Sequence, residues 1–160
     1  MTGGQMSLST SIPDSYTATS PLGAYENQLD AVKIAIEAGA TYVARTTVAH
    51  PRGFMKYFKK ALKHKGTTVI EICTICPTFY GRKNLDTVGI PNAEGGKKMD
   101  TGGKMINYLM ERSVRINQAK LMSEKELRYH YVIGEFYHNT DKLEYSEVYR
   151  RIQEKMMKRT

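Results

Sequence analysis

The chain has 160 residues, a formal net charge of +8 at pH 7 and two cysteines. This length is enough for one domain with its own hydrophobic core, and two cysteines cannot build the disulfide framework of a small secreted protein. No apolar run approaches the roughly 20 residues that cross a bilayer, and the N-terminus lacks the charged and apolar regions of a signal peptide. We therefore expect a soluble, cytoplasmic protein that does not enter a membrane.

The basic excess lies after the first third of the chain. Residues 1–50 carry four acidic and two basic side chains, whereas residues 51–100 carry ten basic and four acidic ones. The positive electrostatic potential of such a surface attracts an anionic cofactor or an acidic protein. Basic residues are nowhere interleaved with aromatic ones in the manner of an RNA-binding sheet, so we expect no nucleic-acid partner.

The first half of the chain predicts an α/β fold. Residues 1–26 are rich in Gly, Ser, Thr and Pro and predict an extended loop. Residues 27–84 then alternate between helix and strand patterns. They predict a helix that ends at Gly39, a strand over 41–45, a helix that begins at Pro51 and ends at Gly66, and a strand over 67–72. This order predicts a parallel sheet flanked by helices, with function collected at the carboxyl ends of the strands.

The second half predicts mainly helices. Residues 77–103 read as loop by composition, and a helix is expected over 104–119, followed by an apolar docking arm over 129–141 and an amphipathic helix over 144–157. We therefore divide the single domain into a loop (1–26), an α/β core (27–84), a second loop (85–103) and a helical C-terminal extension (104–160).

Both cysteines lie at the end of the second strand, in the sequence Cys73-Thr-Ile-Cys76-Pro77. A redox dithiol is disfavoured because Pro77 and a loop, rather than a helix, follow the second thiol. Zinc needs two more ligands at a matching spacing, and an iron–sulfur cluster needs four ligands, usually all cysteines. The thiols are therefore either structural, or part of a site whose other ligands lie on another polypeptide.

The N-terminal residues Met1 to Gln5 (MTGGQ) form a second candidate. A Gly-Gly turn after a threonine offers backbone amides and a hydroxyl group to an anion. The same residues also occur in a common expression tag, and Gly-Gly marks any tight turn.

Five segments in this order resemble the latter half of the β subunit of 2-oxoacid:ferredoxin oxidoreductases, and the similarity is greatest to the 2-oxoglutarate type. They are MTGGQ, GATYVART, HKGTTVIEICTICPT, GRKN and IGEFYHNTD. The resemblance covers nearly the whole chain, and the ordered matches favour a native N-terminus over a tag.

The resemblance implies the C-terminal part of a thiamine diphosphate-binding fold and an enzyme that oxidatively decarboxylates a 2-oxoacid with coenzyme A and ferredoxin. It implies no catalytic side chain in this chain. It makes Cys76 a ligand of a [4Fe–4S] cluster and leaves Cys73 in the core. The residues implied to contact cofactor or substrate are Thr2, Gly3, Gly4 and Gln5, with Met1 as apolar support.

The chain departs from the family pattern in two respects. The family's Gly-Asp-Gly motif and downstream Asn, which hold Mg²⁺, are absent, and so are three further cluster cysteines. We therefore expect thiamine diphosphate, Mg²⁺ and the cluster to be completed outside this chain, by an N-terminal half and an α subunit, and the chain to be inactive alone. Two alternatives stay open: a non-catalytic interaction module that retains the fold, and the pyruvate or branched-chain 2-oxoacid form of the enzyme.

Overall fold

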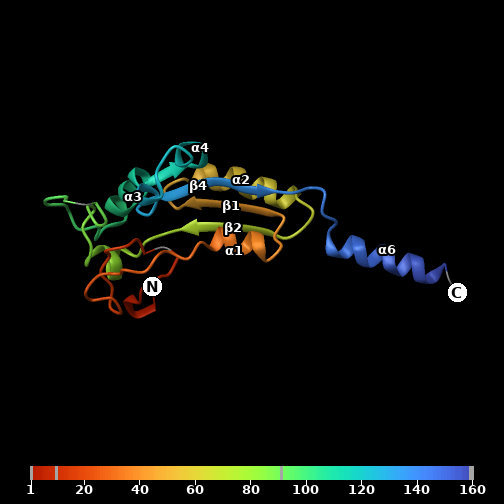
Figure 1. Cartoon of the computed structure of the whole chain (residues 1–160), viewed down its shortest axis with the longest axis horizontal. Coiled ribbons are helices and arrows are strands. Elements are labelled where there is room, and N and C mark those ends of the chain that lie inside the picture. Colours follow the sequence, from red (N-terminus) through yellow and green to blue (C-terminus); the bar gives the residue numbers. More distant parts are fainter. Residues whose placement is uncertain (1, 10, 91, 159–160) are drawn as a thin grey trace.

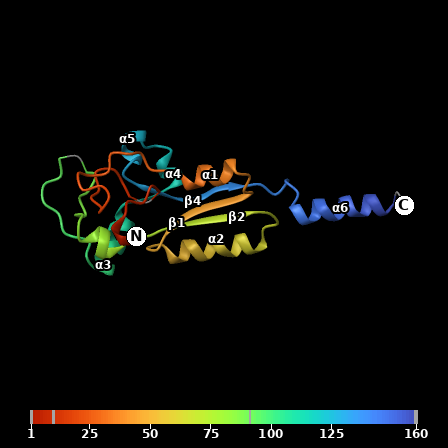
Figure 2. The same ribbon diagram turned by 90° about the horizontal axis from the view of Figure 1, so that it is seen from below.

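The computed structural model describes residues 2–9, 11–90 and 92–158. Helices α1 (Ala31–Glu37) and α2 (Pro51–Lys63) cover opposite faces of a four-stranded sheet, as Figure 2 shows. The predicted α/β class is confirmed.

The sheet has the strand order β2-β1-β4-β3. Strands β1 (Tyr42–Thr47) and β2 (Thr68–Cys73) are parallel, as expected, but β4 (Tyr131–His138) runs antiparallel to β1, and β3 (Ser113–Arg115) is parallel to β4. The sheet is therefore mixed rather than wholly parallel. The segment interpreted as a docking arm supplies β4, because its buried side chains Tyr131 and Ile133 cover the core instead of a partner.

Local sequence explains where the first elements begin and end. The Asp30 carboxylate caps α1 by accepting hydrogen bonds from Val32 N (3.2 Å) and Lys33 N (3.4 Å), and Gly39 ends the turn after α1 with a φ of 95°. Pro51 occupies the first turn of α2, where a backbone N–H is not needed.

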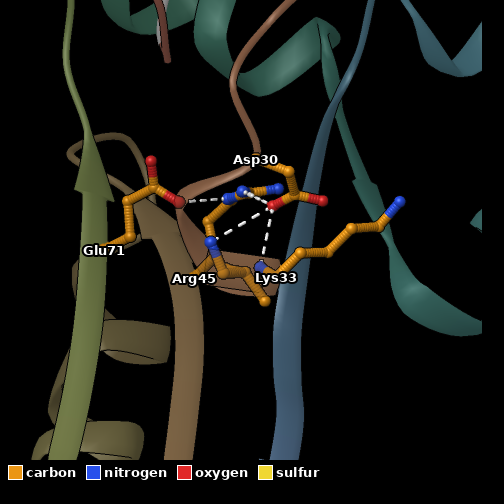
Figure 3. Close-up of polar contacts among 5 residues, drawn as sticks. Asp30, Lys33, Arg45 and Glu71 are labelled. Atoms are coloured by element: carbon orange, nitrogen blue, oxygen red, sulfur yellow. Dashed lines mark hydrogen bonds and ion pairs between the residues drawn. The ribbon is translucent and has the colours of Figure 1, made fainter. Parts of the chain in front are cut away.

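A charged network joins α1, β1 and β2 (Figure 3). Arg45 donates from Nε to Glu71 Oε2 over 2.5 Å and from a terminal nitrogen to Asp30 Oδ1 over 2.6 Å. Its guanidinium also stacks 5.4 Å from the ring centroid of Phe136 on β4. One largely buried cation therefore ties the cap of α1 to three neighbouring strands.

Helix α2 packs less deeply than its sequence suggests. The pattern predicts Phe54, Phe58, Ala61 and Leu62 as an inward stripe, yet Phe58 is 41% and Leu62 is 71% exposed. Only Phe54 and Ala61 are half-buried. Helix α2 contacts both β1 and β2, and β2 is an edge strand of the described sheet.

The helix expected over 104–119 ends early. Helix α3 (Gly102–Glu111) stops at Arg112, and β3 and α4 (Ile116–Ala119) follow. The buried Arg112 guanidinium donates to the carbonyl oxygens of Asp86 (3.3 Å) and Val88 (3.2 Å) in the preceding loop, and this fixes the chain where it turns into the sheet. The segment 104–160 is thus only partly helical.

Two more helices lie before and after β4 in the sequence. Helix α5 (Glu124–Leu127) begins with a capping box, in which Ser123 and Glu126 bond each other's backbone. Helix α6 (Tyr145–Met157) follows β4, matches the predicted helix and projects away from the rest of the chain (Figure 1). Among the described residues, no helix is both long and apolar enough to cross a membrane.

Candidate functional site

The segments singled out by the sequence gather at one end of the sheet. Figure 1 shows the N-terminal segment and the loop after β2 at the carboxyl ends of β1 and β2. The N-terminal segment contains a single 3₁₀ turn, η1 (Thr2–Gly4), and the loop begins with one π-helical turn, η2 (Pro77–Gly81). The carboxyl ends of parallel strands are where α/β proteins bind ligands.

The two glycines of the N-terminal segment differ in their surroundings. Gly4 is buried, and a methyl group there would lie 3.3 Å from Cδ1 of Phe79 in η2 and 3.4 Å from Cβ of Ala18. Gly3 is exposed with a φ of 60°, and a methyl group there would meet nothing within 4 Å. Gly4 therefore lets the segment pack on η2, while Gly3 leaves its backbone open to a ligand.

The other residues of this segment can be placed only in part. Gln5 is exposed, and its neighbour Met6 donates its N–H to Thr19 Oγ1 over 2.9 Å. Met1 and the side chain of Thr2 lie outside what the structure describes.

Asn84 joins the N-terminal loop, at Tyr16, to η2. The sequence analysis did not identify Asn84 as a site residue. Its side chain is 1% exposed and is fully used: Oδ1 accepts from Tyr16 N (2.7 Å), while Nδ2 donates to the carbonyl oxygens of Tyr16 (2.8 Å) and Tyr80 (2.9 Å). Asn84 is the last residue of the GRKN segment, which is part of the resemblance, and this was the only feature of the sequence that pointed to it.

Cys76 lies immediately before η2 and is partly exposed. Phe79 N donates to its Sγ over 3.4 Å, and this hydrogen bond lowers the pKa of the Cys76 thiol, against the opposing effect of its burial. The thiolate is the form that binds metals and reacts with electrophiles, and the lowered pKa of Cys76 favours this form.

Cys73 is different, although it is only three residues away. It is 3% exposed and belongs to a core cluster with Ile75, Tyr108 and Leu109. Burial, reinforced by Glu71, raises the pKa of the Cys73 thiol to about 12. The interpretation of Cys73 as a core residue agrees with this environment.

Alkylation distinguishes the two thiols. With iodoacetamide at pH 8 we expect Cys76 to react at least about 100-fold faster than Cys73, of which only about one molecule in 10,000 is thiolate at that pH. Peptide mass spectrometry over time measures both rates. In denaturant the two rates should converge, and equal rates in the native chain would contradict the assignment.

The described residues do not complete a metal site. Among them no group of three or more His, Cys, Asp or Glu side chains is arranged to hold a metal ion. Any metal ion or cluster at this end of the sheet would therefore need ligands from elsewhere.

Comparisons with known proteins agree with the α/β fold described above. Residues 1–72 match the family model of the thiamine pyrophosphate enzyme C-terminal TPP binding domain. A solved structure, 2-oxoglutarate:ferredoxin oxidoreductase from Magnetococcus marinus with 2-oxoglutarate, coenzyme A and succinyl-CoA bound, superposes with a TM-score of 0.65 at 23% identity. The match covers 97% of this chain and 48% of that chain, and it shows a shared fold.

Curated relatives extend the similarity along the chain. The 2-oxoglutarate synthase subunit KorB of Methanocaldococcus jannaschii is 42% identical over 156 residues, which are 98% of this chain and 52% of the relative. KorB of Methanothermobacter marburgensis is 38% identical over 136 residues, 85% of this chain and 43% of the relative. The chain is therefore similar to the KorB subunits of 2-oxoglutarate synthases and spans about half the length of these relatives.

Proposed function

We propose that this chain is part of the β subunit of a cytoplasmic 2-oxoacid:ferredoxin oxidoreductase that oxidises 2-oxoglutarate with thiamine diphosphate and coenzyme A. The observation that carries the proposal is the close packing of Gly4 on η2, where an added methyl group would lie 3.3 Å from Cδ1 of Phe79. It joins the predicted cofactor segment, Thr2 to Gln5, to the turn that begins at Cys76, and it does so at the carboxyl ends of β1 and β2.

Each candidate residue receives a role under this proposal. The open backbone at Gly3 and the exposed Gln5 contact thiamine diphosphate or substrate, together with Thr2 and with Met1 as apolar support. Thiamine diphosphate, when bound, supplies the carbanion stabilisation that decarboxylation requires. Cys76 provides one ligand of a [4Fe–4S] cluster, and the N–H of Phe79 remains available to its sulfur, a contact that tunes cluster potentials.

The incomplete metal site requires partner chains. The remaining cluster cysteines and the Mg²⁺ ligands come from an N-terminal half, and an α subunit completes the enzyme, with ferredoxin as electron acceptor. The open edge of β2 is where the N-terminal half adds to the sheet. Supporting this docking, β2 is the edge strand of the described sheet and its Ile72 is 43% exposed.

Reconstitution tests the proposal. The chain is co-expressed with an N-terminal half and an α subunit of this enzyme class, purified without oxygen and assayed for ferredoxin reduction that requires both 2-oxoglutarate and coenzyme A. Cys76→Ala should remove most of the brown iron–sulfur absorbance and at least about 90% of the activity, since a [4Fe–4S] cluster is normally bound by four thiolates. The matched control Cys73→Ala should keep both, because Cys73 is a core residue.

The outcomes separate the alternatives. Full iron content in Cys76→Ala would show that the ligand assignment is wrong. A wild-type complex that assembles without oxidising any 2-oxoacid would indicate the non-catalytic module. A preference for pyruvate or a branched-chain 2-oxoacid over 2-oxoglutarate would indicate that form of the enzyme.

A further inference from the structure

A cavity of about 720 Å³ lies at the carboxyl end of β1 and the start of α2. The first turns of α2, the end of β1, the middle of β4 and the start of α4 form its walls. Neither Thr2 to Gln5 nor the turn that begins at Cys76 is among the residues that line it.

The cavity is basic. His50, Arg52, Lys56 and Arg115 line it, and within the described ranges no ion pair engages Arg52, Lys56 or Arg115. The one acidic residue of its wall, Glu135, is already neutralised: its Oε2 lies 2.8 Å from Lys60 Nζ and accepts from the Tyr42 hydroxyl over 3.1 Å. A net positive field therefore faces the open space.

A buried hydroxyl without a partner faces the same region. Thr46 lines the cavity and is 0% exposed, yet its Oγ1 has no hydrogen-bond partner within the described part of the chain. It lies 3.6 Å from the position that a methyl group on Gly53 would occupy. A buried hydroxyl that makes no hydrogen bond costs free energy. A ligand that accepts a hydrogen bond from Thr46 Oγ1 would account for the unpaired hydroxyl.

The backbone of α2 adds donors at the same point. The first N–H groups of a helix have no partner within the helix, and His50 at the N-cap makes no side-chain hydrogen bond to them. Gly53 in the first turn has no side chain that would cover the backbone. Free amides at the positive end of a 13-residue helix favour an anion.

We propose that this cavity binds a phosphate group of a small molecule, held by the Thr46 hydroxyl, the first amides of α2 and the basic side chains Arg52 and Arg115. A phosphate accepts several hydrogen bonds at once, and its negative charge complements the three cationic side chains of the wall, Arg52, Lys56 and Arg115. The proposal concerns binding by this chain and does not depend on the proposed enzymatic function.

Calorimetric titration of the full chain tests the proposal at constant ionic strength, with inorganic phosphate in one arm and ADP in the other. We expect saturable binding that Thr46→Val weakens by about tenfold, since one hydrogen bond to a charged group is lost. Valine has the shape of threonine, and removing a hydroxyl without a partner should leave the thermal midpoint of the ligand-free chain unchanged or raised. Tighter binding of ADP would identify a phosphate ester as the ligand, and equal binding would identify free phosphate.

Two further variants keep the test independent of Thr46. Gly53→Ala adds a methyl group beside Thr46 Oγ1 and places a better helix former in α2, so it should fold normally and bind at least about tenfold more weakly. Arg52→Gln should weaken binding about fivefold, whereas Lys33→Gln, which removes the same charge on α1 outside the cavity, should have no effect. The proposal is overturned if neither ligand binds, or if Thr46→Val and Gly53→Ala bind as the wild type does.

Discussion

Replacing Arg45 with methionine is expected to lower the free energy of unfolding by about 2–3 kcal/mol, because two carboxylates then lose their shared cation. The side chains of Arg45 and Glu71 are 13% and 16% exposed, and that of Asp30 is 34% exposed, so solvent screens this network only in part. The change also removes the support that holds the cap of α1 near β1 (Figure 3). Urea denaturation followed by circular dichroism measures the effect.

Two comparisons isolate the charge effect. Lys104→Met breaks the exposed pair with Asp100, whose side chains are 48% and 38% exposed, and should cost less than about 0.5 kcal/mol. Adding Asp30→Asn and Glu71→Gln to Arg45→Met removes the uncompensated charges and should restore most of the lost stability. A loss below about 1 kcal/mol in Arg45→Met, or no recovery in the triple variant, would contradict this account.

The parts of the fold that depend on local signals were predictable from the sequence. Helices α1 and α2 and strands β1 and β2 follow from periodicity, from Pro51 at a helix start and from Gly39 at a helix end, and their bounds differ from the prediction by a few residues. The antiparallel pairing of β4 with β1 was not predictable in this way. It joins Tyr42 to His138, nearly a hundred residues along the chain, and no local pattern specifies such a partner.

The same distinction holds for the candidate site. Cys76 and the Thr2 to Gln5 segment were named from motifs, since the resemblance attaches to short runs of residues. Asn84 escaped notice because its role lies in hydrogen bonds to the backbone of Tyr16, 68 residues earlier. A residue that binds main-chain groups leaves no complementary side chain in the sequence by which its partner can be recognised.

Changing Asn84 to aspartate should have the largest effect on the end of the sheet that carries the candidate site. The carboxylate keeps an acceptor for Tyr16 N, but it cannot donate to the carbonyl oxygens of Tyr16 and Tyr80, as the amide nitrogen of Asn84 does. It also places a charge at a position that is 1% exposed. We expect the free energy of unfolding to fall by about 3–4 kcal/mol at pH 8.

The pH dependence of this loss identifies its cause. Burial next to carbonyl oxygens raises the pKa of the introduced carboxyl in the folded state, so the folded variant binds a proton more tightly than the unfolded one. Its deficit relative to the wild type should therefore shrink as the pH falls from 8 to 5, where the protonated carboxyl again donates one hydrogen bond. Urea unfolding of both proteins at each pH measures the difference, and hydrogen exchange at the Tyr16 amide shows whether the N-terminal segment detaches from η2. A deficit that is equal at both pH values would mean that lost shape, and not the charge and its missing donors, destabilises the variant.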